Sequence, residues 1–238
     1  AGRMGVIDRW VLSSTLDWLK LNDKVLARNQ FVCMNLSGAS LNDERFKEDV
    51  YAMLDKHRAL APRICLEITE SVALNDTGTT RIFIDRIRGY GAKVALDDFG
   101  AGYTSFNYLK DLPADLLKID GSFIVNMNQH PANIAIVEAI VSLARTLNMQ
   151  TIAEWAEDPE TVATLAEIGV DYVQGFIVAK PQTPRDLLNA TSSASFILDP
   201  QLQLYLEDLQ LTDDELNKVD MILGASGAAL APPRIEAA

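Results

Sequence analysis

Short apolar runs rich in β-branched residues alternate along the chain with longer segments whose apolar positions recur at helical spacing. The short runs predict strands, and they cover residues 31–37, 63–69, 93–98, 116–120, 151–155 and 172–178. The longer segments predict helices over residues 6–19, 41–57, 74–90, 131–149 and 159–168. Strand and helix alternating in this way are typical of an α/β fold built on a parallel sheet.

The predicted strands are apolar on both faces, as expected where helices cover one face and a packed interior covers the other. A closed barrel of the TIM type whose first strand or two are absent fits this pattern, and a doubly wound open sheet is the competing architecture. We expect the barrel domain to span residues 1–192 and a C-terminal helical extension and tail to span 193–238. Within the extension, residues 199–223 predict one or two helices, with Thr212 as an N-cap, and residues 224–238 predict a tail.

Composition narrows the class of partner. The 238 residues include 33 acidic and 21 basic side chains, a formal net charge of −12, which argues against a nucleic-acid polymer as ligand because such surfaces are built from Lys and Arg. No apolar run approaches the roughly 18 residues of a membrane span, so we expect a cytoplasmic protein, or a cytoplasmic domain, that meets a membrane only through segments outside this chain. Cys33 and Cys65 lie in strand-like apolar runs and are interpreted as buried small side chains rather than a disulfide.

Polar side chains stand at or just past the carboxyl end of nearly every predicted strand. Parallel strands bring these ends to one edge of the sheet or barrel, which is where such folds bind ligands. Agreement among six strands is the strongest indication of a functional site. The residues are Asn35, Glu67, Asp97, Asp98, Lys118, Glu154 and Gln174.

The adjacent carboxylates of Asp97 and Asp98 can converge only if the chain leaves strand geometry there, which Gly100 and Gly102 would permit. Two carboxylates that close repel unless a proton or cation lies between them. Oxygen donors without His or Cys suit Mg²⁺ or Mn²⁺, and a pair of such ions is typical of phosphoester hydrolysis. Lys118 could orient the attacking water or bind phosphate.

Structural roles unrelated to a site are alternative interpretations for three single residues. Asp98 could be a helix N-cap, Lys118 a solvated surface lysine, and Gln174 a partner for backbone groups.

Six segments in this order resemble the EAL-domain family of cyclic di-GMP phosphodiesterases over residues 4–182. They are MNLS (34–37), LEITES (66–71), DDFGAGYTSFNYL (97–109), LPADLLKID (112–120), IAEWAED (152–158) and GVDYVQGF (169–176).

The resemblance implies a modified (βα)₈ barrel that hydrolyses cyclic di-GMP, a bacterial second messenger, to linear pGpG. It implies that two Mg²⁺ or Mn²⁺ ions bind at the strand ends, held by five oxygen-donor side chains. It also implies that Lys118 contacts the attacking water and that Glu157 and Gln174 support the metal ligands. Glu70 is implied to anchor the loop DFGAGYTS, and a homodimer is expected. The implied metal ligands are Asn35, Glu67, Asp97, Asp98 and Glu154.

Two departures from the family pattern stand out. No Glu-Ala-Leu motif, which supplies a further metal ligand on the first strand, occurs near the start of the chain; by spacing it would precede Ala1. Trp155 stands where the family usually has glycine, and packing under the neighbouring loop is favoured over crowding of the guanine pocket.

The sequence therefore predicts an enzyme. A catalytically weak or inactive cyclic di-GMP receptor is the alternative, kept open by the missing motif and Trp155, and a purely structural dimerisation module is disfavoured by the acidic rim.

Overall fold

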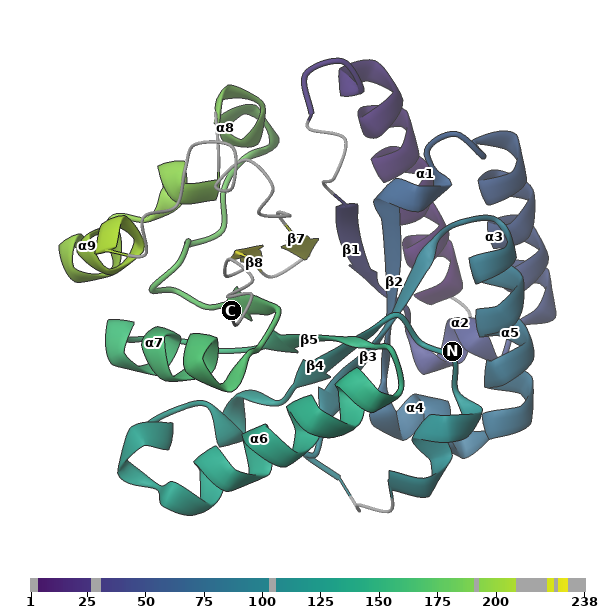
Figure 1. The fold of residues 1–238 in the computed structure, drawn as a ribbon. Helices are drawn as coiled ribbons and strands as arrows, with labels where there is room; N and C mark the ends of the chain where they lie inside the picture. Colours follow the sequence, from purple (N-terminus) through teal and green to yellow (C-terminus); the bar gives the residue numbers. More distant parts are fainter. Residues whose placement is uncertain are drawn as a thin grey trace. The chain divides into compact units, whose positions relative to one another are not determined.

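The computed structural model describes residues 4–26, 31–102, 106–190, 193–208, 222–224 and 227–230. The chain divides into two compact units, Ala1–Leu116 and Leu117–Ala238, which are considered in turn (Figure 1).

Unit 1 contains three parallel strands with helices packed against them. The strands are β1 (Phe31–Asn35), β2 (Ile64–Thr69) and β3 (Lys93–Phe99). The helices are α1 (Met4–Asn22), α2 (Gly38–Leu41), α3 (Glu44–Lys56), α4 (Glu70–Asn75) and α5 (Thr77–Gly89), with 3-10 turns η1 (Ala61–Arg63) and η2 (Phe106–Asp111).

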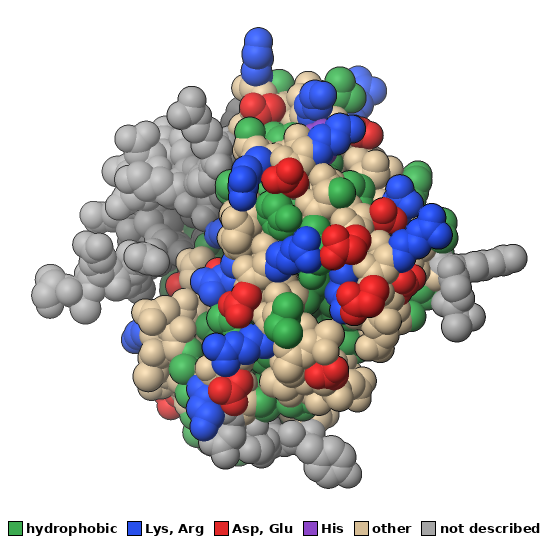
Figure 2. All heavy atoms as spheres, turned by 90° about the vertical axis from the view of Figure 1, so that its right-hand side faces the viewer, with side chains coloured by type: hydrophobic (Ala, Val, Ile, Leu, Met, Phe, Trp, Pro, Cys, Tyr) green, Lys and Arg blue, Asp and Glu red, His purple; other side chains and the backbone are tan. Residues whose placement is uncertain are grey.

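Helical periodicity explains the packing of unit 1. Leu12, Leu16 and Leu19 fall on one face of α1 at spacings of four and three residues, and all are fully buried or nearly so. The outer surface over α3 and α5 instead carries interspersed acidic and basic side chains (Figure 2). Arg86 of α5, for example, pairs with Glu48 of α3 at 3.0 Å.

Unit 2 continues the alternation of strand and helix. The strands are β4 (Leu116–Ile119, beginning on the last residue of unit 1), β5 (Gln150–Ala153), β6 (Tyr172–Gln174), β7 (Ile222–Gly224) and β8 (Gly227–Leu230). The helices are α6 (Pro131–Thr146), α7 (Pro159–Ile168), α8 (Pro184–Asn189) and α9 (Pro200–Asp208), with 3-10 turns η3 (Gly121–Phe123), η4 (Met127–Gln129) and η5 (Ser193–Phe196). β5 and β6 are parallel, whereas β8 pairs antiparallel with both β6 and β7.

The six predicted strands and five predicted long helices are all present, which confirms the α/β class. Cys33 and Cys65 are buried free thiols, also as predicted. Among the described residues, no helix is both long enough and apolar enough to cross a membrane.

The C-terminal segment differs from its prediction. Helix α9 is present, but Ile222–Gly224 is a strand rather than helix, and Gly227–Leu230 is a strand where a tail was expected. The physical reason is the exposed edge of β6: Val173 pairs with Leu230, so β8 satisfies backbone groups that the edge would otherwise present. The predicted N-cap Thr212 lies outside the described residues.

Candidate active site

In unit 1, three of the predicted oxygen donors share one face of the sheet at the carboxyl ends of the strands. Asn35 of β1 stands directly opposite Glu67 of β2, and Glu67 stands opposite Ala95 of β3. Asp97 lies two residues beyond Ala95, and side chains two apart in a strand point to the same face. Glu67 and Asp97 are buried, with 2% and 7% of their surface exposed. Register alone thus groups an amide and two buried carboxylates on one face.

The backbone conformation changes at Asp98, the residue directly after Asp97. Its φ of 55° lies in the left-handed region, where a non-glycine residue costs about 1–2 kcal/mol. Gly100 also has positive φ, at 94°, but Gly102 does not, so the turn after β3 begins earlier than the glycine pattern predicts. Asp, with a short polar side chain, is among the residues that tolerate this conformation. The turn interrupts the strand alternation that would send the Asp98 side chain to the opposite face from Asp97.

Glu70 is buried at the first turn of α4 and binds the segment that follows β3. Its carboxylate accepts hydrogen bonds from the Gly100 N–H, at 3.0 Å, and from the Tyr108 hydroxyl. Burial, followed by the hydrogen bond and the charge of Glu70, raises the pKa of Tyr108 well above its ordinary value. The Tyr108 hydroxyl therefore keeps its proton, and its hydrogen bond to Glu70, to a higher pH than an ordinary tyrosine would. The contact between Tyr108 and Glu70 was not predicted from the sequence. The position of Tyr108, eleven residues after Asp97 in the segment that resembles the family, could have indicated a role near the site.

In unit 2, Lys118 and Glu154 form a buried ion pair. The Lys118 Nζ lies 2.8 Å from Glu154 Oε1, and the two side chains are only 4% and 9% exposed. Lys118 is therefore not the solvated surface lysine of the alternative interpretation. The Glu154 N–H donates to the Ile119 carbonyl at 3.3 Å, which fixes the residue just past the end of β5 beside β4. The pair thus sets an ammonium against a carboxylate at the ends of neighbouring strands.

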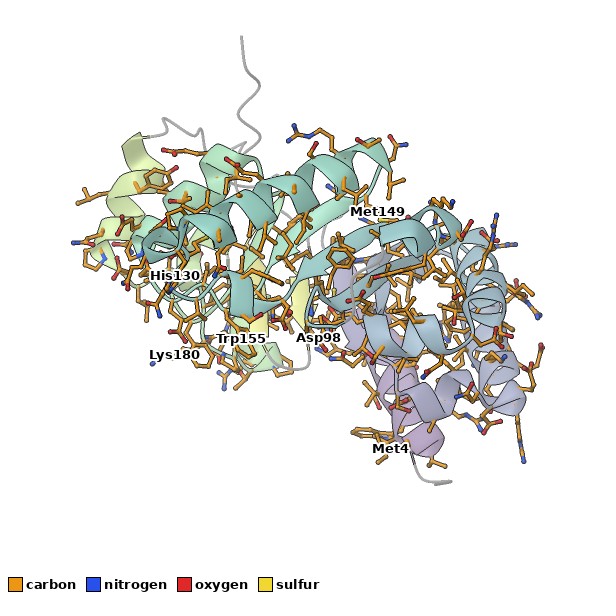
Figure 3. All side chains as sticks on the ribbon, turned by 90° about the horizontal axis from the view of Figure 1, so that it is seen from below. Met4, Asp98, His130, Met149, Trp155 and Lys180 are labelled. Atoms are coloured by element: carbon orange, nitrogen blue, oxygen red, sulfur yellow. The ribbon has the colours of Figure 1, made fainter. Side chains whose placement is uncertain are left out.

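Trp155, next to Glu154, packs against the backbone of Gly121 in η3, the turn that follows the neighbouring strand β4. Its φ is 58°, again left-handed, and 59% of the residue is exposed (labelled in Figure 3). A Cβ placed on Gly121 would lie 2.2 Å from Trp155 Cδ2, so the ring occupies the space that the glycine leaves free. The prediction that Trp155 packs against a neighbouring loop is therefore met in part, because the ring lies against Gly121 but remains largely exposed. Gly121 was missed because no sequence pattern marks it.

Of the two remaining predicted residues, Gln174 belongs to β6 and Glu157 lies four residues past the end of β5. Gln174 ends β6, is half-buried, and its backbone carbonyl accepts from the Ala156 N–H at 3.1 Å. A Cβ on Gly175 would come within 1.9 Å of the Ala156 carbonyl oxygen, so this backbone contact requires glycine. Glu157 is exposed.

The chemistry of the donors fits a hard divalent cation. The donors that the register groups in unit 1 are an amide oxygen and carboxylates, the ligand types that hard divalent cations prefer. The neighbouring Cys33 thiol has a pKa raised by burial, which disfavours a thiolate ligand. Buried carboxylates on one face raise each other's energy, and a divalent ion offsets that repulsion. The Lys118 ammonium of unit 2 adds a donor suited to a phosphate oxygen or a water.

An α/β chain whose strand ends carry buried acidic residues and a buried lysine has the features of a barrel-type protein with a ligand site at that edge. The particular family follows from sequence comparison: the model of the EAL domain matches residues 1–181, and the chain belongs to this family. It is 38% identical over 188 residues to the cyclic di-GMP phosphodiesterase PdeF of Escherichia coli, covering 79% of this chain and 25% of that protein. It is 35% identical over 179 residues to the cyclic di-GMP phosphodiesterase PdeB of Shewanella oneidensis, covering 75% of this chain and 21% of that protein. The chain thus spans about a quarter of the length of these relatives.

Solved structures of EAL domains share the fold. The EAL domain of Mycobacterium smegmatis DcpA has a TM-score of 0.73 at 33% identity, covering 82% of this chain and 87% of that one. The EAL domain of Pseudomonas aeruginosa FimX, solved with cyclic di-GMP, has a TM-score of 0.66 at 26% identity, covering 74% and 70%. The fold class is therefore the TIM-like α/β barrel of EAL domains, as predicted.

Proposed function

We propose that this EAL domain hydrolyses one phosphodiester bond of cyclic di-GMP to give linear pGpG, using two Mg²⁺ or Mn²⁺ ions. The observation that carries the proposal is the register of unit 1, which puts Asn35, Glu67 and Asp97 on one face at the ends of three parallel strands. Relatives named cyclic di-GMP phosphodiesterases supply the substrate class.

We assign the metal ligands to Asn35, Glu67, Asp97 and Asp98 of unit 1 together with Glu154 of unit 2. When bound, the ions would lower the pKa of water and neutralise charge on the phosphoryl oxygens. Their oxygen-donor set matches the preference of Mg²⁺ and Mn²⁺.

Lys118 has the second role in this proposal. We assign its buried ammonium, which pairs with Glu154, to a contact that positions the attacking water beside phosphorus. No side-chain nucleophile is needed, since water is the attacking group. Lys118→Ala should accordingly lower the rate more than it lowers affinity for the ions.

The remaining residues act on the ligands rather than on the substrate. Glu70 holds the segment after β3 through Gly100 and Tyr108, so it positions Asp97 and Asp98. Gln174, at the end of β6, and Glu157, in the segment after β5, are proposed to support Glu154. A homodimer and a cytoplasmic location complete the proposal.

The test is chromatography of cyclic di-GMP incubated with the protein and Mn²⁺. The wild type should yield pGpG, and Asp97→Asn should lower the rate by at least 100-fold, since it removes charge where phosphoryl charge must be neutralised. Asp85→Asn is the matched control, because Asp85 is an exposed residue of α5 paired only loosely with Arg81 at 3.8 Å. Full turnover by Asp97→Asn would refute the assignment.

The alternative is a receptor that binds cyclic di-GMP without hydrolysing it. The FimX domain solved with intact cyclic di-GMP shows that an EAL fold can hold the ligand. Tight binding by the wild type with no pGpG in the presence of Mn²⁺ would favour this alternative over the enzyme.

A further inference from the structure

Trp155 combines three features that folding alone does not explain. It is a large aromatic residue with 59% of its surface exposed. It has a left-handed backbone, and it directly follows Glu154, whose side chain is buried in the ion pair with Lys118. Adjacent Cα atoms are about 3.8 Å apart, so the ring is attached at the edge of the proposed site.

The backbone conformation marks Trp155 as unusual. Four non-glycine residues in the described part of the chain have positive φ: Asp98, Asn126, Asn148 and Trp155. The first three are Asp or Asn, the types that adopt this conformation most readily, whereas a bulky residue there is an outlier. Glycine would adopt it without strain. Strain of this kind at a site points to a functional gain that offsets it.

The contact with Gly121 shows how the ring is held. A Cβ on Gly121 would lie 2.2, 2.4 and 2.5 Å from Cδ2, Cγ and Cε3 of the indole. Since Cγ and Cε3 are both bonded to Cδ2, three nearly equal distances place that carbon above the ring face rather than at its edge. The backbone of Gly121 therefore covers part of one face of the indole, and the residue's large exposure leaves surface open to a ligand.

We infer that Trp155 is a stacking platform for one guanine base of the dinucleotide. An indole supported on one face offers a flat, polarisable surface on which a nucleobase gains stacking energy without a specific hydrogen bond. The phosphodiester and its flanking base are joined in one ligand, so a group reacting beside Glu154 brings a base within reach of the adjacent residue. This inference rests on the proposed function and adds to it a base-binding residue.

Binding measured by intrinsic fluorescence tests the inference. Cyclic di-GMP is titrated with Ca²⁺ in place of Mn²⁺, and chromatography verifies that the ligand stays intact. The wild type should show quenching, and Trp155→Phe should lose most of it while keeping the dissociation constant within about 3-fold, because a smaller ring still stacks. Trp155→Ala should bind roughly 5- to 150-fold more weakly, the range that corresponds to loss of one stacked base.

Two further variants make the test specific. Trp10→Phe is the matched control, because Trp10 is 67% exposed on α1 and should contribute neither to the ligand-dependent quenching nor to affinity. Gly121→Ala should weaken binding although Trp155 itself is unchanged, since the new methyl group displaces the indole ring. Circular dichroism identifies any variant that is misfolded.

The outcomes separate this inference from the proposed function. If the wild type binds and hydrolyses cyclic di-GMP but Trp155→Ala binds equally well, the stacking role is refuted and the enzyme assignment stands. If Trp155→Gly binds more tightly or turns over faster, the ring crowds the site instead, which also refutes stacking. If the wild type neither binds nor hydrolyses the ligand, both are refuted.

Discussion

Removing the charge of Glu154 is expected to destabilise the protein far more than removing a similar charge at the surface. Glu154 lies 2.8 Å from Lys118, and both side chains are less than a tenth exposed. Glu154→Gln keeps the shape but leaves the buried ammonium without this counter-charge. Breaking a buried pair by removing one partner costs about 3–5 kcal/mol, because the remaining charge stays out of water.

Thermal unfolding followed by circular dichroism in EDTA measures this cost without divalent ions. For a chain of this size each kcal/mol corresponds to roughly 2–4 °C in Tm, so Glu154→Gln should lower Tm by about 6–20 °C. Glu48→Gln is the control: Glu48 pairs with Arg86 at 3.0 Å, but these side chains are 63% and 47% exposed. An exposed pair contributes at most about 1 kcal/mol, so this Tm should fall by no more than about 4 °C.

A double variant completes the measurement. Lys118→Met with Glu154→Gln removes both charges and should be more stable than Glu154→Gln alone, since neither ion remains buried. Two results would refute the reasoning. One is a Tm for Glu154→Gln as high as that of Glu48→Gln. The other is a double variant whose decrease in Tm equals the sum of the decreases measured for Lys118→Met and Glu154→Gln separately.

Two further perturbations follow from contacts in each unit. Gly175→Ala should lower the free energy of unfolding in urea by about 3 kcal/mol, because the new Cβ would lie 1.9 Å from the Ala156 carbonyl oxygen. Gly89→Ala is the control: nothing lies within 4 Å of its Cβ position, so this variant should raise the free energy of unfolding by about 0.5–1 kcal/mol. Equal effects of the two substitutions would contradict the close approach at Gly175. The raised pKa of Tyr108, caused by burial and by Glu70, means that above about pH 10 the unfolded chain loses a proton that the folded chain keeps, so stability falls as pH rises. Urea unfolding at pH 8–11 should show a shallower fall for Tyr108→Phe, and parallel curves for the two proteins would contradict the role of the hydroxyl.

The strands and their polar ends could be predicted because one rule governs both. Parallel strands buried on two faces require continuous apolar runs, so a polar residue at the end of such a run stands out. Asn35 and Lys118 illustrate this, each interrupting or ending a run that is otherwise apolar. Parallel pairing brings these ends to one edge of the sheet, but the register that sets Asn35 opposite Glu67 is known only from the structure.

Contacts between segments distant in sequence could not be predicted in the same way. The approach of Trp155 to Gly121 joins residues 34 positions apart, and neither shows a periodic pattern that indicates the contact. Strand β8 was missed because its composition of Gly, Ala and Leu has weak strand preference, and pairing with β6 determines its conformation. In both cases tertiary contacts override local preference.

Each unit contains a buried acidic residue that is directly followed by a non-glycine residue with positive φ. Asp97 and Glu154, both buried acids, are each followed by a residue with φ near 55–58°, namely Asp98 and Trp155. A left-handed residue ends strand alternation immediately after the acid, so the next side chain need not point away from the site. Asp tolerates this position and offers a carboxylate there, but Trp is strained and its ring remains largely exposed. Stability alone favours glycine at 155, and the stacking role proposed for Trp155 would offset the strain of its backbone.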